Sequence, residues 1–281
     1  MRSQEPDTSP TGSVERDART VRDVGWSALL KALAVTGMEL RKLRRDPTEL
    51  ATRAIQPALW LTVFGEVMSR ARMIDTGDTP YLAFLVPGIL AQSVLFIAIF
   101  NGISVIWERD LGIVHKLLAS PTPRTSLVLG KALGGGVRAL VQAVVVLGLA
   151  VLMGVHLKWH LLGLCGAVLL VLLGAMLFST FSLCIACIVK TRERFMGVGQ
   201  VLTMPLFFAS NAIYPTSAMP NWLRFISHIN PLTYQIEGLR HLLLPTVTHA
   251  QFSLTTDFGV LIGALAALVV TAARLYPTIV Q

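Results

Sequence analysis

Histidine and cysteine pairs are the residues of this sequence whose types and spacing could do chemistry. His156 and His160 stand four residues apart, the separation at which two imidazoles on one helical face can bind zinc, but no carboxylate or thiol lies beside them. Cys184 and Cys187 have the spacing of a redox dithiol, yet they lie in a long apolar run where burial opposes the thiolate. We therefore expect no metal site, and we interpret the cysteines as small packing residues.

The sequence also gives no support for nucleotide chemistry. The dipeptide Gly130-Lys131 lacks both the earlier glycine and the following hydroxyl residue of a phosphate-binding loop. The glycine run 134–136 lies within an apolar stretch, which favours close helix packing rather than a phosphate cradle. No Ser, His and Asp set is placed where a nucleophile could assemble. We expect no catalytic residues, no cofactor bound by this chain, and a protein that is not an enzyme.

The composition indicates that the membrane is the solvent of this protein. Of its 281 residues, 53% are hydrophobic and only 14% are charged, and the mean hydropathy is +0.64, above what a water-soluble domain tolerates on its surface. The net charge of +8 comes from basic residues scattered between apolar stretches. This distribution is typical of cytosolic loops and not of a nucleic-acid-binding face. We expect membrane lipids as partners and no nucleic acid.

The polar N-terminal region is predicted to be cytosolic. Residues 1–23 have almost no large apolar side chains and are expected to form a disordered tail, with no cleavable signal peptide. Residues 24–46 predict an amphipathic interfacial helix, and residues 47–281 the transmembrane domain. The apolar and basic faces of the interfacial helix are marked by Trp26, Leu30, Arg41 and Arg44.

Apolar runs of about 20 residues predict an all-α polytopic membrane protein with about six transmembrane helices. The predicted spans are 54–69, 82–106, 132–155, 161–189, 196–214 and 258–276. Lys and Arg concentrate in alternate segments on one side, with Arg240 counted among the few on the other side, and this bias places both termini in the cytosol. We expect a multi-pass protein of a bacterial-type cytoplasmic membrane.

Few polar side chains lie within the predicted spans, and these are the candidates for lining a transport pathway. They are Glu66, Gln92, Asn101, Arg138 and Gln142. An arginine at the bilayer midplane costs up to about 3 kcal/mol on insertion scales. We therefore expect Arg138 to extend toward the cytosolic face rather than to contact substrate. Glu66, near the outer end of the short first span, could reach water or line the route.

A short segment of mixed charged and apolar residues joins the second and third predicted spans. Residues 108–118 predict an amphipathic helix that ends before Pro121 and Pro123. An amphipathic helix between two spans needs a surface to lie against. That surface is either the membrane itself or a groove on a cytosolic partner.

Two groups of residues resemble the permease subunits of type-2 ATP-binding-cassette exporters, which include daunorubicin-resistance, nodulation-factor and polysaccharide export branches. The first group resembles the cytosolic signature between the second and third spans: Glu108, Gly112, Leu117, Leu118, Pro121 and Gly130-Lys131. The second resembles the outer segment before the last span: Tyr214-Pro215, Met219-Pro220, Trp222-Leu223, Asn230-Pro231-Leu232-Thr233-Tyr234 and Arg240. The similarity covers roughly residues 24 to 276.

The resemblance implies a permease that pairs with itself or with a sister permease and binds two separate ATPase subunits, which would hold ATP and Mg²⁺. It also implies that residues 215–244 form outer re-entrant helices that cap the exit. The cytosolic helix would then couple the permease to the ATPases. Its coupling residues would be Glu108, Arg109, Leu111, Gly112, Val114, Leu117, Leu118 and Pro121.

Several functions agree with these features. Export of amphiphilic drug-like or lipid-like molecules fits best, because the intramembrane surfaces are overwhelmingly apolar. A polysaccharide or glycolipid exporter is the alternative within transport, although such cargo would want more aromatic lining than a chain with 7% aromatic residues offers. A membrane enzyme would show catalysis by the purified chain without an ATPase, and a non-transporting scaffold or sensor would co-purify with no ATPase.

Overall fold

The computed structural model describes residues 54–72, 74–112, 124–189, 191–245 and 251–275. Every regular element within these ranges is helical, as the sequence predicts. Several predicted features lie outside the described residues: the tail 1–23, the interfacial helix 24–46 with Trp26, Leu30, Arg41 and Arg44, and the coupling residues Val114, Leu117, Leu118 and Pro121.

Four helices among the described residues are long and apolar enough to cross a membrane. They are α4 continued by α5 (Tyr81–Asn101 and Ile103–Asp110), α7 (Arg124–Leu152), α8 (Leu161–Ile188) and α12 (Leu254–Leu275). They correspond to the predicted spans 82–106, 132–155, 161–189 and 258–276. α7 stops short of the predicted boundary at 155 because the chain turns at Gly154, whose φ of 78° lies in the left-handed region.

The other two predicted spans form shorter helices. Residues 54–71 are continuously helical, with a π-helical turn, η1 (Trp60–Gly65), preceding α3 (Glu66–Ala71). α9 (Arg192–Phe208) has 17 residues, so the predicted boundary at 214 was wrong. The helix ends in a tight turn, in which the backbone N–H and the hydroxyl of Ser210 both donate to the Phe207 carbonyl, at 3.2 and 2.6 Å.

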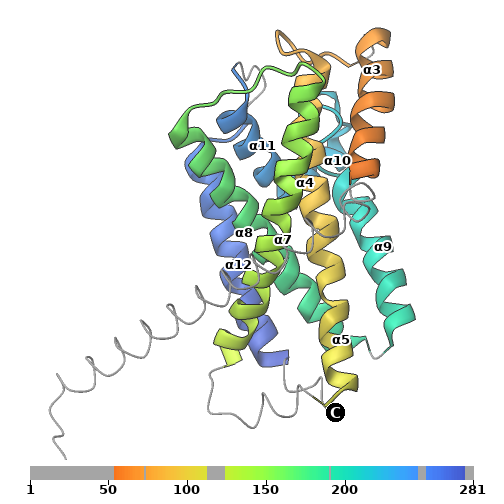
Figure 1. Ribbon diagram of the computed structural model, residues 1–281, viewed down its shortest axis with the longest axis vertical. Coiled ribbons are helices and arrows are strands. Elements are labelled where there is room, and N and C mark those ends of the chain that lie inside the picture. The colour runs from red at the N-terminus through yellow and green to blue at the C-terminus, as the bar shows by residue number, and fades with distance from the viewer. Residues whose placement is uncertain (1–53, 73, 113–123, 190, 246–250, 276–281) are drawn as a thin grey trace, which may run out of the picture.

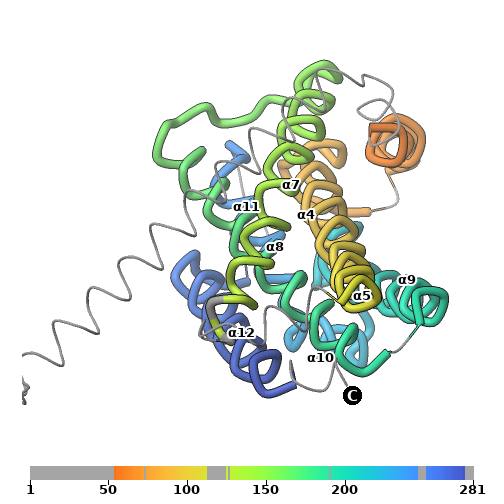
Figure 2. Tube along the Cα trace, turned by 60° about the horizontal axis from the view of Figure 1, so that its bottom comes forward, coloured from red at the N-terminus to blue at the C-terminus, as the bar shows by residue number. Residues whose placement is uncertain are grey.

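The long helices lie side by side along the long axis of the molecule. α8 packs against α4, α7, α11 and α12, while α4 also contacts η1 and α9. Figure 1 shows α12 on one flank of the bundle and α9 on the other, and the tilted view of Figure 2 keeps these two helices apart. α4 therefore joins the flank formed by α9 and residues 54–71 to the rest of the bundle.

The two ends of the bundle carry different elements. The C-terminal turn of α5 and the first turn of α9 lie together at the bottom of Figure 1, which we call the α5 end. Toward the opposite end, η2 (Thr216–Ala218), α10 (Asn221–Ile229) and α11 (Pro231–Leu243) connect α9 to α12. We call this the α11 end.

The hydrophobic core is centred on α4, which is buried on nearly all sides. Leu85, Ile89 and Leu95 of α4 are fully enclosed. Gly88 faces the segment that follows α9, where a Cβ atom would lie only 2.6 Å from the Ala212 carbonyl oxygen. A glycine at this position therefore allows the α11 end to approach α4 directly.

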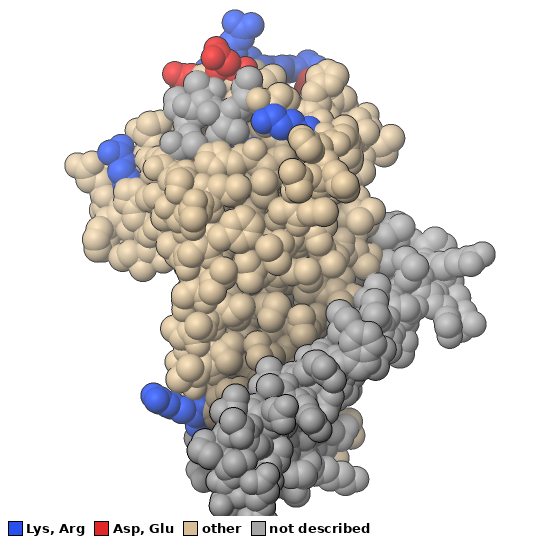
Figure 3. Space-filling view, turned by 90° about the vertical axis from the view of Figure 1, so that its left-hand side faces the viewer, with Lys and Arg blue, Asp and Glu red and all other residues tan. Residues whose placement is uncertain are grey.

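The lateral surface of the bundle is apolar. Large hydrophobic side chains are exposed on α7, α8 and α12, for example Val144, Leu162 and Ile262. Figure 3 shows a broad band without charged residues on one face, with Lys, Arg, Asp and Glu toward its upper end and Lys or Arg toward its lower end. Such a surface would be costly in water, but hydrocarbon is as apolar as these side chains. The band matches the surface that a lipid bilayer covers.

Candidate coupling and pathway sites

Ion pairs join three helices at the α5 end. Glu108, in the last turn of α5, pairs with Lys131 of α7. Asp110 Oδ2 lies 2.8 Å from Nη2 of Arg192, the first residue of α9. The Arg192 guanidinium also lies 3.9 Å from the centroid of the Trp107 ring. The end of α5 is thus tied to both α7 and α9.

These contacts fix geometry more than they add stability. Their side chains are partly exposed, and ion pairs of this kind contribute about 0.2–1 kcal/mol each. The sequence pointed to Glu108, Arg109 and Lys131 but not to Arg192 or Trp107. Charge pairing between segments far apart in the chain leaves no local spacing signal, so these two residues emerge only from the fold.

The predicted start of the coupling helix at residue 108 was wrong. Glu108 and Arg109 end α5, which continues the direction of α4, rather than open a new helix. Nη2 of Arg109 lies 3.1 Å from Oδ1 of its neighbour Asp110. Gly112 follows α5 with a φ of 70°, and glycine in this region commonly ends a helix. The turn leaves the Leu111 side chain exposed at the α5 end.

Asn101 and Arg138 meet where α4 passes into α5. Nη1 of Arg138 in α7 donates to Oδ1 of Asn101 at 2.9 Å. The Ser182 hydroxyl of α8 donates to the Ile99 carbonyl beside the break between the two helices. Polar side chains of α7 and α8 thus donate hydrogen bonds to polar groups at the point where this membrane helix is interrupted. The sequence singled out Asn101 and Arg138 but not their pairing.

The other candidate pathway residues occupy two different settings. Gln92 of α4 and Gln142 of α7 are buried, on helices that pack against each other. Glu66 is exposed and pairs with Arg70 one turn later on the same helix, at 2.9 Å. The structure therefore places Glu66 on the surface, on an element separate from the Asn101 and Arg138 pair.

Asn230 and Pro231 form a capped junction between α10 and α11. Oδ1 of Asn230 accepts from the backbone N–H of Leu232 at 3.0 Å, which satisfies a free donor of the first turn. Its Nδ2 donates to the Leu206 carbonyl at 2.7 Å. Pro231 occupies the start of α11, where its missing N–H would have no helical partner. Asn230 thus begins α11 and fastens it to α9.

Arg240 is buried within α11. Its guanidinium donates to the carbonyl oxygens of Phe84, Asn211 and Ala212 and lies 3.6 Å from the centroid of the Phe84 ring. Nearby, the Tyr81 hydroxyl donates to the Ile213 carbonyl at 3.0 Å. These bonds hold α11 and the segment after α9 against the start of α4.

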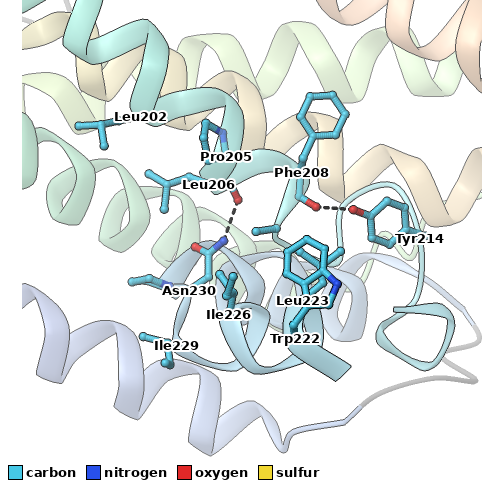
Figure 4. Close-up of a pocket in the computed structure, with 12 residues that line it drawn as sticks. Leu202, Pro205, Leu206, Phe208, Tyr214, Trp222, Leu223, Ile226, Ile229 and Asn230 are labelled. Carbon is cyan, nitrogen blue, oxygen red and sulfur yellow. Dashed lines mark hydrogen bonds between the residues drawn. The ribbon is translucent and has the colours of Figure 1, made fainter. Parts of the chain in front are cut away.

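An apolar groove of about 710 Å³ separates α9 from α10. Its walls are formed by Leu202, Leu206 and Phe208 on one side and by Trp222, Ile226 and Ile229 on the other (Figure 4). The Tyr214 hydroxyl donates to the Phe208 carbonyl, and Pro215 follows as the residue before η2. The groove suits an aliphatic chain or ring system and offers few hydrogen-bonding groups.

The residues that the sequence first suggested for chemistry are not assembled into a reactive site. His156 and His160 are exposed, and Cys184 and Cys187 are buried in α8. Within the part of the chain that the structure describes, no three His, Cys, Asp or Glu side chains are grouped so as to hold a metal ion.

Long apolar helices and an uncharged lateral band define a polytopic helical membrane protein. The chain belongs to the ABC-2 type transporter family, whose profile matches residues 31–244. The resemblance drawn from the two groups of sequence motifs is therefore confirmed.

Three relatives are transport permeases. The chain is 32% identical over 205 residues to the transport permease ycf38 of Cyanophora paradoxa, covering 72% of this chain and 70% of that protein. It is 25% identical over 238 residues to the daunorubicin resistance ABC transporter permease protein DrrB1 of Streptomyces coeruleorubidus, covering 83% of each. It is 27% identical over 220 residues to the inner membrane transport permease YadH of Escherichia coli K12, covering 76% of this chain and 81% of that protein. Membership of this family supports a membrane-embedded transport permease subunit and implies association with ABC ATPases.

Proposed function

We propose that this chain is the membrane subunit of an ATP-driven exporter that moves amphiphilic drug-like or lipid-like molecules out of the cytoplasm or the inner leaflet. The observation that supports this proposal best is the set of ion pairs at the α5 end. There, in a member of a transport permease family, one helix end is paired with two neighbours through Glu108 and Asp110. A displacement of α5 would therefore be passed to α7 and α9.

In the proposed assembly, two permeases bind two ATPase subunits at the α5 end, which faces the cytosol together with both termini. The second permease is another copy of this chain or a sister protein, and the ATPases hold ATP and Mg²⁺. Residues 54–71 and α9 complete a set of about six spans, because short helices cross where the bilayer thins or a partner helix covers them. Residues 215–244 enter the membrane from the outer face as a re-entrant segment.

The mechanism follows from the contacts between elements. ATP-driven closure of the partner subunits would shift α5, and the Asp110 and Arg192 pair would carry that shift to α9. α9 forms one wall of the apolar groove, and its Leu206 carbonyl is bonded to Asn230 at the start of α11. Movement of α9 would thus change the groove and the seating of α11 together. ATP can drive this movement only if the ATPase makes different contacts with the permease in the two states.

The groove favours amphiphilic cargo. Its lining is almost entirely aliphatic and aromatic, with the polar atoms of Tyr214 and Asn230 at its margin. One relative is a daunorubicin resistance permease, and this supports multidrug efflux and antibiotic resistance over other export roles. A polysaccharide or glycolipid remains the alternative cargo, and it would need hydrogen-bonding groups supplied by a second permease at the interface.

The proposal is tested by purifying the tagged chain from its native membrane. We expect an ABC ATPase to co-purify, and its ATP hydrolysis in proteoliposomes to rise several-fold with daunorubicin or a short-chain phospholipid but not with an oligosaccharide. Stimulation by the oligosaccharide alone would reassign the cargo. Recovery of the intact chain without any ATPase would contradict the proposed function.

A further inference from the structure

Two buried carboxyl groups lie in the seam between α11 and α12. Glu237 of α11 is 2% exposed and Asp257 of α12 is 0% exposed. A Cβ atom built on Gly238 would be in ordinary van der Waals contact with Oδ2 of Asp257, at 3.5 Å, so the Asp257 carboxyl group lies against α11 at the residue next to Glu237. Because α11 and α12 pack against each other, the two acids belong to one helix contact.

Three of the four carboxyl oxygens lack a hydrogen-bond partner. Oε1 of Glu237 accepts from the backbone N–H of Gln251. Oε2 of Glu237 and both Oδ atoms of Asp257 have no partner among the described residues. A buried acceptor without a donor destabilises the fold, so binding of a proton or another donor at this contact would be favourable.

Two basic side chains, Arg240 and His228, attract Glu237 electrostatically, but each donates or bonds to other groups. The N–H groups of Arg240 donate to backbone carbonyls, and Arg240 faces Tyr81 of α4. The His228 ring of α10 bonds to a side-chain amide at 3.1 Å. The Tyr234 hydroxyl donates to the His228 carbonyl at 2.6 Å and is not free to serve the carboxyls.

A proton is the ligand that this arrangement fits. Two ionised carboxylates buried close together are opposed by both desolvation and mutual repulsion. Burial raises the pKa of Glu237, an effect opposed by the Gln251 N–H and by the charge of Arg240. A proton on one carboxyl removes this repulsion and gives the pair an O–H donor. A metal ion would want more ligands, and the described residues hold no group of three His, Cys, Asp or Glu side chains.

We propose that Glu237 and Asp257 together bind one proton taken from solvent, and that this shared proton fastens α11 to α12. The pair then carries one negative charge instead of two. Release of the proton at high pH separates the carboxyls and loosens α11. Since α11 begins at the Asn230 junction, the loosening reaches the wall of the apolar groove at Leu206. The inference rests on these side chains and not on the transport assignment.

The test is thermal unfolding of the full-length chain in detergent from about pH 5 to about pH 9. The native pair holds a proton that the unfolded chain releases, so stability falls as pH rises above the ordinary carboxyl range. The unfolding equilibrium constant changes by up to about tenfold per pH unit within that window. Glu237→Gln and Asp257→Asn should each flatten this dependence. Glu66→Gln, at an exposed carboxylate, should keep the wild-type slope.

An infrared measurement on the wild-type protein covers the case in which the amide variants fail to fold. Above about pH 6 the exposed carboxyls are ionised, so a carbonyl band of a protonated carboxylic acid should persist at neutral pH and vanish at high pH. Absence of this band would overturn the proposal. Equal pH dependence of stability in the wild type and all three variants would also overturn it. Stabilisation by Na⁺ or Ca²⁺ that is lost in Asp257→Asn would overturn it too, because it would reveal a cation site.

Discussion

At the scale of single residues, Arg240 donates hydrogen bonds to backbone carbonyls of the non-helical segment after α9. The segment after α9 runs through a buried region, and its carbonyls at Asn211 and Ala212 have Arg240 as a donor. The planar guanidinium serves several oxygens at once, while its face rests on the Phe84 ring. This one side chain therefore holds three elements in register.

Replacement of Arg240 should destabilise the protein far more than replacement of an exposed arginine. We expect Arg240→Met to cost about 3 kcal/mol, because it leaves several buried carbonyls without a donor. The matched control is Arg224→Met. Arg224 also donates to three carbonyls, at 3.1, 3.2 and 3.3 Å, but it is partly exposed and water can replace it, so the cost should stay below about 1 kcal/mol. Thermal unfolding in detergent measures both, and equal losses would refute the account of Arg240.

At the scale of elements, α5 continues α4 beyond Gly102, where a Cβ atom would lie 2.2 Å from the Ser182 hydroxyl oxygen. In the proposed mechanism, α5 would pass its movement to α9 through two contacts. One is the ion pair of Asp110 with Arg192, and the other is the Trp107 ring beneath the Arg192 guanidinium.

A charge swap tests this transmission. Asp110→Arg and Arg192→Asp should each lower substrate-stimulated ATP hydrolysis several-fold in proteoliposomes, and the double variant should regain most of it. Stability should change by less than about 1 kcal/mol, because the pair is partly exposed. The same exchange at Glu66 and Arg70, a pair within one helix, should leave ATP hydrolysis unchanged. A double variant as impaired as the singles would contradict the role of the pair.

At the scale of the whole molecule, the sequence predicts the long helices well because their length and apolarity are local properties. α8 and α12 occur close to where the apolar runs place them. The end of α9 was predicted too late, at Tyr214, because the chain stays largely apolar beyond the turn that Ser210 closes on the Phe207 carbonyl. By length and composition, four described helices qualify as spans where about six were predicted.

The residues of the candidate sites also divide into those that the local sequence indicates and those that only the fold brings together. The Asn230-Pro231 junction depends on neighbouring residues, and the sequence singled it out as part of the outer motif, although its role as a helix cap was not predicted. The burial of Arg240, the link from Arg192 to α5 and the pairing of Glu237 with Asp257 depend on elements far apart in the chain. Each of these residues reads as an ordinary charge when only its neighbours in sequence are considered.

The central claim is that an ABC ATPase drives this permease from the α5 end, and site-specific photo-crosslinking in native membranes tests it most directly. The probe replaces Leu111, which is 69% exposed at the α5 end, or as a control Trp222, which is 66% exposed toward the α11 end. We expect the probe at Leu111 to capture an ABC ATPase and the probe at Trp222 to capture none. Capture of the ATPase from Trp222, or from neither position in a correctly inserted chain, would contradict the account.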